Sequence, residues 1–271
     1  MKFVRRDLGE SSEASSGGGV RGLGREITTL VSAAIILGSA FYWGTGWVVE
    51  WTLPHISAER EQRWFSSFRI DESKAETTED ENTQRDYAAR VLAKLTQHPE
   101  VPKIDFQLIV IDDKDPNAFA IPGGTIAVTT GLLDVVGDDE VALAFVLGHE
   151  LGHFTQRDHL RGFGRAIGRG LVWILISGDS SGIDLISEST QQLLDLGHSR
   201  QQESDADQWG MRLVLAIYGT DQGSDQLFRW LAARDQTPVW FNFTSSHPAP
   251  ADRIDKLRVY ARELSSDTSK R

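Results

Sequence analysis

The sequence predicts an α+β protein, mainly helical with one small β-sheet, behind a single N-terminal transmembrane helix. Three observations predict this. An uncharged apolar run occupies residues 27–49, strand-like patterns occur only between residues 104 and 129, and helical patterns dominate from residue 138 onward. We therefore expect a membrane anchor followed by one globular domain.

The composition is that of a folded protein with a strongly acidic surface. The chain has 271 residues, of which 40% are hydrophobic and 25% charged, as in globular domains. Its net charge of −11 argues against nucleic acid as a partner. The absence of cysteine excludes a disulfide framework and a thiolate metal site. Nothing in the sequence indicates an oligomeric state.

The apolar run from Ile27 to Val49 is long enough to span a bilayer. It comprises 23 residues without a charge. A signal peptide has a shorter apolar region of roughly 7–15 residues, and no small-residue cleavage site follows this one. A buried core helix remains the alternative. The aromatic residues near its end suit a membrane interface: Tyr42, Trp43, Trp47 and Trp51.

The distribution of basic residues predicts the orientation of this span. Five basic residues precede it, namely Lys2, Arg5, Arg6, Arg21 and Arg25. Only three follow within about 20 residues, namely Arg60, Arg63 and Arg69. The bias favours a cytoplasmic N-terminus, with the globular domain on the outer side, in a periplasm or an intermembrane space.

Changes in composition divide the chain into five segments. The N-terminus is rich in serine and glycine, and residues 71–85 are polar and acidic, as expected of a solvated linker. We expect a disordered tail (1–26), the transmembrane helix (27–49), a juxtamembrane linker (50–84), the globular domain (85–264) and a C-terminal tail (265–271).

Periodicity predicts the elements of the globular domain. A first helix has apolar residues at Tyr87, Val91, Leu92 and Leu95 and ends near Pro99. Strands follow at 104–111, 118–121 and 125–129, the last two flanking a Pro-Gly-Gly turn. Helices are expected from Asp138 onward and at about 160–177, 183–217, 222–234 and 249–264. The apolar run 171–176 is too short to span a bilayer and predicts a core helix, with contact to the membrane surface as the alternative.

The segment from His149 to His153 reads H-E-x-x-H. On a helix these two histidines lie one turn apart on the same face, where both imidazoles can coordinate one zinc ion. Glu150 lies beside them, placed to accept a proton from a water molecule that the metal activates. A surface helix with two solvated histidines is the alternative. The apolar flank 142–147 instead predicts a buried helix, in which a zinc ion would partner the histidines.

A second acidic motif offers the third ligand that a catalytic zinc site needs. Glu203 and Asp207 are spaced to share one helix face. We expect Glu203 to bind zinc and Asp207 to accept the free N–H of a zinc-bound histidine, which fixes its tautomer. Asp205 points elsewhere and is expected in solvent. Taken alone, this run is an ordinary acidic helix face.

Together these motifs resemble a known protease family. H-E-x-x-H followed by S-R-x-x-E-x-x-A-D (residues 199–207) is similar to the CaaX prenyl protease and its bacterial heat-shock membrane relatives, which are zinc endopeptidases with a glutamate ligand. Residues 117–128 resemble that family's N-A-F-A-x-P-G-G-x-I-x-V segment, and residues 247–254 its H-P-x-x-x-x-R-I motif. The resemblance covers about residues 85–260. It implies a zincin-like metallopeptidase domain with one Zn2+ per chain.

The resemblance also suggests roles for residues outside the two metal motifs. His247 is the candidate donor to the oxyanion. It could instead brace its loop, or bind the metal as a fourth ligand and keep the enzyme latent. Arg253 is expected to anchor the same loop, and Arg200 to pair with a carboxylate near the site. The family often has Arg-His after the zinc helix; here Asp158 intervenes, so we interpret His159 as a surface residue.

The likeness implies an extended polypeptide substrate. The strand residues Asn117, Ala118, Phe119 and Ala120 would offer an edge to which a peptide adds by main-chain hydrogen bonds. Gly123 and Gly124 would form a turn that allows close backbone approach. Such binding tolerates many sequences and suits unfolded or membrane-associated proteins, whereas prenylated substrates are not implied by one span.

The sequence thus predicts a membrane-anchored zinc endopeptidase that acts on extended or misfolded proteins in protein quality control. The alternatives are a zinc-containing, chaperone-like module that binds misfolded proteins without cleaving them, and a membrane adaptor with a structural metal. The intact Glu150 argues against the first, since a binder needs no base. A site with a carboxylate ligand and an open position argues against the second.

Overall fold

The computed structural model describes residues 19–66, 69, 79–177, 197–233, 247 and 253–268. The chain divides into two units, Met1–Gly44 and Thr45–Arg271. The described part is mainly helical with one small sheet, which confirms the predicted fold class. Most of the predicted N-terminal tail lies outside the described residues.

Helix α1 (Gly19–Thr52) contains the predicted span. The stretch Gly24–His55, which covers most of α1 and the three residues after it, is long and apolar enough to cross a membrane, and none of its most apolar window is buried. Leu30 and Leu37 are each 70% exposed. A core helix of a soluble protein would bury such side chains, so the structure does not support that alternative.

Three short strands form the sheet: β1 (Gln107–Ile111), β2 (Ala118–Ile121) and β3 (Thr125–Thr129). The strand order is β1-β3-β2, with β1 parallel and β2 antiparallel to β3. The first strand is shorter than predicted, whereas the other two match the prediction. Among the described residues, strand β2 therefore lies at an edge of the sheet.

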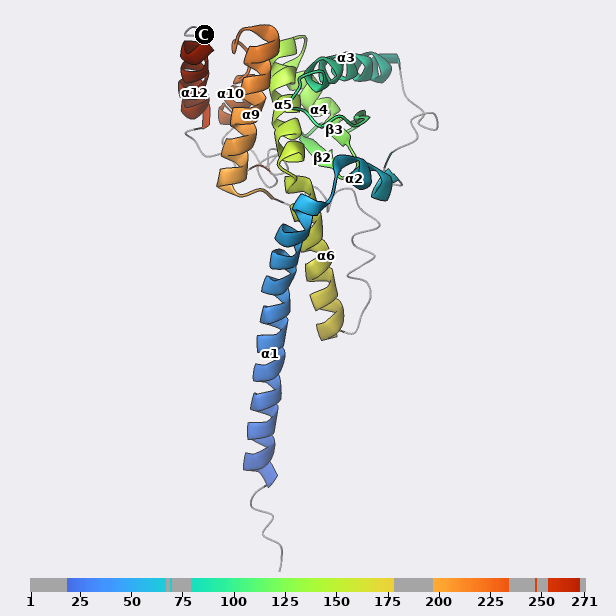
Figure 1. The fold of residues 1–271 in the computed structure, drawn as a ribbon, viewed down its shortest axis with the longest axis vertical. Coiled ribbons are helices and arrows are strands. Elements are labelled where there is room, and N and C mark those ends of the chain that lie inside the picture. The colour runs from blue at the N-terminus through green and yellow to red at the C-terminus, as the bar shows by residue number, and fades with distance from the viewer. Residues whose placement is uncertain are drawn as a thin grey trace, which may run out of the picture. The chain divides into compact units, whose positions relative to one another are not determined.

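Helix α5 is the centre of the second unit. It contacts α9, α3, β2 and α4, and α9 lies between α5 and α12 (Figure 1). Buried apolar side chains from these helices, among them Leu95, Phe145 and Met211, form one core with β1 and β3. The helices are α3 (Glu79–Thr96), α4 (Thr130–Val136), α5 (Glu140–Thr155), α9 (Arg200–Tyr218), α10 (Gln226–Ala232) and α12 (Arg253–Thr268).

Side-chain caps determine where the two metal-motif helices begin. The Asp139 carboxylate accepts hydrogen bonds from the backbone N–H groups of Val141 and Ala142 at the start of α5. Ser199 forms a capping box with Gln202 at the start of α9. The prediction of a helix continuous from residue 183 is therefore wrong at residues 197–199, while residues 183–196 lie outside the described part.

The predicted linker contains two short helices, η2 (Leu53–His55) and α2 (Ala58–Trp64). Glu61 of α2 is 1% exposed and accepts a hydrogen bond from the N–H of Gly123 at 3.1 Å. Its carboxylate also pairs with His159 at 2.7 Å. The interpretation of His159 as a surface residue is wrong, because its ring is buried between Glu61 and Phe154.

Candidate active site

Small residues bring α5 and α9 into backbone contact. A Cβ at Gly148 would lie 3.1 Å from the Cα of Gly210, and a Cβ at Gly152 would lie 3.0 Å from the Cα of Ala206. Larger residues at these crossing points would force the helices apart. The close crossing places the histidine face of α5 directly against the carboxylate face of α9.

Three predicted ligands converge at this crossing. The Nε2 atoms of His149 and His153 lie 3.0 Å apart. The Glu203 carboxylate oxygens lie 3.5 Å from the first of these nitrogens and 3.3 Å from the second. Together with His247, these residues offer ligand atoms that all lie within 4.8 Å of one another, and all four residues are buried.

Each of the two histidines has its other ring nitrogen on a carboxylate. Nδ1 of His149 lies 2.9 Å from Asp207, and Nδ1 of His153 lies 2.9 Å from Asp158. When Nδ1–H donates to a carboxylate, Nε2 keeps a lone pair, as a metal ligand must. The sequence prediction missed Asp158. Arg157, with a φ of 64°, lies between α5 and the next helix, and Asp158 directly after it contacts His153.

The pKa values of the histidines and of Glu203 indicate that this group of buried side chains favours positive charge. Burial lowers the pKa of His149, but hydrogen bonds with Asp207 and Glu203 outweigh it and raise the pKa to about 10. Burial also lowers the pKa of His153, but its hydrogen bond with Asp158 helps to raise the pKa above its ordinary value overall. Burial raises the pKa of Glu203, but the charge of His247 and the other two histidines hold it far below its ordinary value.

These observations together fit a divalent cation. Two buried imidazole nitrogens with facing lone pairs at 3.0 Å would repel each other unless a positive charge lay between them. Two histidine nitrogens and one carboxylate form a donor set that suits zinc and leaves room for a further ligand. The residues His149, His153 and Glu203 therefore fit the zinc ion that the sequence predicts.

Glu150 lies next to this group and is not used by it. The residue is 1% exposed, and its Oε1 atom makes no hydrogen bond within the described residues. The Nε2 atom of His247 lies 3.5 Å from this oxygen. A buried carboxylate with an unbonded oxygen is costly, which is typical of groups retained for chemistry.

His247 bridges the ligand group and the sheet edge. Its Nδ1 lies 3.1 Å from the Glu203 carboxylate and 3.3 Å from Nε2 of His149. Its Nε2 lies 3.3 Å from the carbonyl oxygen of Ala118 in β2. The ring therefore contacts both the candidate ligands and the predicted substrate strand.

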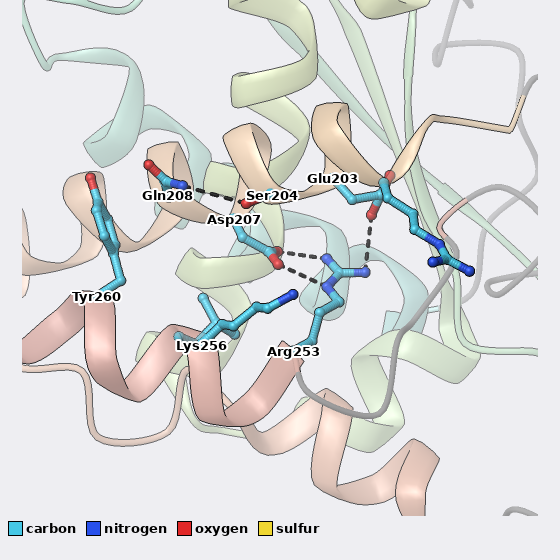
Figure 2. A pocket seen from close by; sticks show the side chains of 9 residues that line it. Glu203, Ser204, Asp207, Gln208, Arg253, Lys256 and Tyr260 are labelled. Carbon is cyan, nitrogen blue, oxygen red and sulfur yellow. Dashed lines mark hydrogen bonds and ion pairs between the residues drawn. The ribbon is translucent and has the colours of Figure 1, made fainter.

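Arg253, at the start of α12, holds the carboxylates of α9 in place (Figure 2). Its Nε and one terminal nitrogen contact Asp207 at 2.8 and 2.6 Å, and the other terminal nitrogen lies 3.0 Å from Glu203. Burial raises the pKa of Asp207, but the hydrogen bond to His149 and the charge of Arg253 lower it overall. Arg253 thus orients both carboxylates, while the loop that the sequence predicts it to anchor lies outside the described residues.

The predicted substrate segment reaches the site at Ala118, whose carbonyl oxygen lies beside His247. Asn117 is buried, and its side-chain oxygen accepts a hydrogen bond from the N–H of Ala118 at 3.0 Å, which shapes the start of β2. Gly123 and Gly124 both have a φ of 94°. A Cβ at Gly123 would lie 2.9 Å from Cβ of Phe65, so this turn is packed closely against the chain itself.

His198 was not singled out by the sequence. Its ring stacks on that of His153, with centroids 3.8 Å apart. Burial and the nearby His153 lower the pKa of His198 well below its ordinary value, so it is neutral. Its only sequence signal is its place directly before the Ser199 motif. It packs against a candidate ligand and helps to fix the plane of that ring.

This chain is similar in sequence to known proteins. Residues 81–261 match peptidase family M48, whose members use zinc. The chain is 30% identical over 182 residues to mitochondrial metalloendopeptidase OMA1 of Schizosaccharomyces pombe, covering 65% of this chain and 53% of the relative. It is 30% identical over 150 residues to metalloprotease LoiP of Escherichia coli (54% and 58%). It is 28% identical over 202 residues to protease HtpX of Legionella pneumophila (59% and 70%).

The match extends over most of the globular domain and includes all of the candidate ligands. The chain spans just over half the length of the first two of these relatives. The family match covers well over half of the chain itself, from the first helix of the domain to α12. The chain therefore belongs to peptidase family M48.

Proposed function

We propose that this protein is a membrane-anchored, zinc-dependent endopeptidase that hydrolyses peptide bonds of extended or misfolded polypeptides. One observation carries the proposal. A buried group of two histidines and Glu203 lies beside Glu150, whose buried carboxylate has an unbonded oxygen. The names of the relatives, which are metalloendopeptidases and proteases, support the same activity.

His149, His153 and Glu203 would hold the zinc ion. The chemistry that zinc supplies in such a site is activation of a water molecule and polarisation of the scissile carbonyl. The Glu150 carboxylate accepts the proton of the attacking water and passes it to the leaving amine. Asp207 and Asp158 keep the two imidazoles in the tautomer that leaves Nε2 free.

Strand β2 is the proposed substrate platform. It is an edge strand, and its residue Ala118 lies beside His247 at the metal group. A peptide that adds to this edge would be held by main-chain hydrogen bonds, with its N–H and carbonyl groups directed sideways at the edge of β2. Main-chain recognition tolerates many sequences, so we infer a role in protein quality control at the membrane. The buried Glu150, which a module that only binds would not need, argues against the alternative of binding without cleavage.

The orientation that we propose places the N-terminus in the cytoplasm and the catalytic domain on the outer side of the membrane. It rests on the excess of basic residues before α1. Protease added to sealed, right-side-out vesicles should then degrade the domain and leave the N-terminus protected. Protection of the domain instead would reverse the assignment.

The decisive experiment compares the full-length protein with its Glu150→Gln variant, both loaded with zinc, on an unfolded test protein. Cleavage by the parent alone is the expected result. Glutamine keeps the shape of the side chain but cannot accept the proton, so rates should fall by at least about 100-fold. Equal cleavage by both proteins would refute the mechanism.

His247→Ala separates the three roles proposed for that residue. Slower cleavage with unchanged zinc affinity indicates a donor to the oxyanion. Faster cleavage indicates a ligand that keeps the enzyme latent. A lower melting temperature with both properties unchanged indicates a brace for the loop.

A further inference from the structure

Helix α6 (Asp158–Ser177) packs against the end of the candidate membrane span. A Cβ at Gly164 would lie 2.6 Å from Cγ2 of Val49, and a Cβ at Gly168 would lie 2.7 Å from Oγ1 of Thr45. Both glycines therefore allow close packing, as small residues four apart do between membrane helices. Upstream of them, Arg161 pairs with Glu50 at 2.9 Å.

These contacts define the direction of α6. As its residue numbers rise, the contacted residue numbers on α1 fall, from Glu50 to Val49 to Thr45. The two segments are thus antiparallel. Because Val49 is the last residue of the predicted span, α6 runs from the membrane surface toward its interior.

Aromatic residues indicate the level of the interface. Trp47 and Trp51 are exposed on the same segment of α1, and tryptophan favours the headgroup region. The contacts at Thr45 and Val49 therefore lie at about this level. The sequence of α6 agrees, since it has Arg161 and Arg165, whose long basic side chains can reach the headgroups.

The rest of α6 is apolar. Residues 171–176 read Leu-Val-Trp-Ile-Leu-Ile, and the helix continues through them to Ser177. At about 1.5 Å per residue, this run lies about 4.5 to 12 Å beyond Gly168 along the helix. That depth is less than half of a hydrocarbon core of about 30 Å, so the helix enters the bilayer but does not cross it.

We propose that the C-terminal part of α6 is embedded in the lipid leaflet through which the end of α1 passes. The occupant of this apolar segment is lipid acyl chains, because the segment continues a packing interface with the span itself. Its N-terminal residue, Asp158, holds His153. The membrane-inserted helix therefore begins within the candidate metal site and keeps that site near the bilayer.

The absence of cysteine allows a direct test with single cysteines in the full-length protein. Ile174→Cys carries an environment-sensitive fluorophore in phosphatidylcholine vesicles that contain lipids with a nitroxide on the acyl chain. Ile36→Cys in the span and Gln222→Cys on the exposed surface serve as references. We expect quenching at position 174 close to that at 36 and at least about twofold stronger than at 222, since nitroxides quench only at short range.

Three results would overturn the proposal. Quenching at 174 equal to that at 222 would place the segment in water. An apolar emission spectrum without lipid quenching would show that protein, such as a second copy of the chain, covers it. Gly168→Leu, which would collide with Thr45, should reduce quenching at 174, whereas Gly38→Leu, in open space, should not. Unchanged quenching in the first variant would refute insertion guided by α1.

Discussion

Replacing Gly210 with alanine tests whether the close crossing of α5 and α9 builds the metal site. The new Cβ would lie 2.9 Å from the backbone nitrogen of His149 and 3.1 Å from the carbonyl oxygen of Phe145. Both are backbone atoms of α5, which cannot rotate away as a side chain can. An ordinary contact needs about half an ångström more, so the two helices must separate by roughly that amount.

This separation should affect metal binding more than stability. Overpacking costs about 1–3 kcal/mol, and the better helix propensity of alanine offsets about 1 kcal/mol of it. The net loss of about 0–2 kcal/mol would lower the melting temperature of the metal-free protein by only a few degrees. Metal–ligand distances tolerate only about 0.2 Å. We therefore expect zinc affinity to fall by at least about tenfold, as when groups that orient ligands are lost.

Competition with a chromophoric zinc chelator measures the affinity, and thermal denaturation of the metal-free protein measures the stability. Gly46→Ala is the matched control, because a Cβ at Gly46 meets nothing within 4 Å. Zinc affinity within twofold of the parent, despite a lower melting temperature, would refute the reasoning. Glu203 would then be positioned by something other than the crossing distance.

Three further predictions concern the groups around the ligands. Asp158→Ala removes the acceptor of His153 Nδ1 and should weaken zinc binding about 10–100-fold by chelator competition, whereas Asp205→Ala should not. Arg253→Met leaves buried carboxylates unpaired and should cost about 3–5 kcal/mol in urea denaturation, whereas Lys256→Met, at an exposed site in the same pocket, should stay within about 0.5 kcal/mol. In metal-free protein, the pKa of His149 is raised from 6.5 to about 10. The protonated imidazole therefore stabilises the fold: this contribution is complete below pH 6.5 and is lost as the pH rises toward 10. The melting temperature of chelator-treated protein should therefore fall between pH 7 and 9; a constant or rising value would contradict the assigned charges.

The sequence predicted those parts of the site that depend on helical spacing alone. His149 and His153, like Glu203 and Asp207, share a helix face because they are four residues apart, whatever the rest of the chain does. The two strands around Gly123 were also predictable, because a turn signal separates two β-branched or apolar runs.

Contacts that depend on tertiary structure could not be predicted in this way. Asp158 reaches His153 only because Arg157 adopts a left-handed conformation, which arginine rarely does and which no local pattern indicates. His159 is buried because Glu61, far away in the sequence, accepts its hydrogen bond. Helix α4, only two turns long, is too short for its periodicity to be distinguished from that of a strand or loop.

The charges of the buried site explain why these distant residues meet there. Its carboxylates are Glu150, Asp158, Glu203 and Asp207, all buried. Arg253 contacts two of them, and Arg161, which also pairs with Glu50, contacts a third. The carboxylates of the site thus outnumber its arginines, and the positive charge of a zinc ion would offset this excess. Without the ion, protons can offset it, and the raised pKa values of His149 and His153 show where they bind. Metal and protons therefore compete for the same nitrogens, so zinc binding should release protons, and the number released should fall as the pH rises.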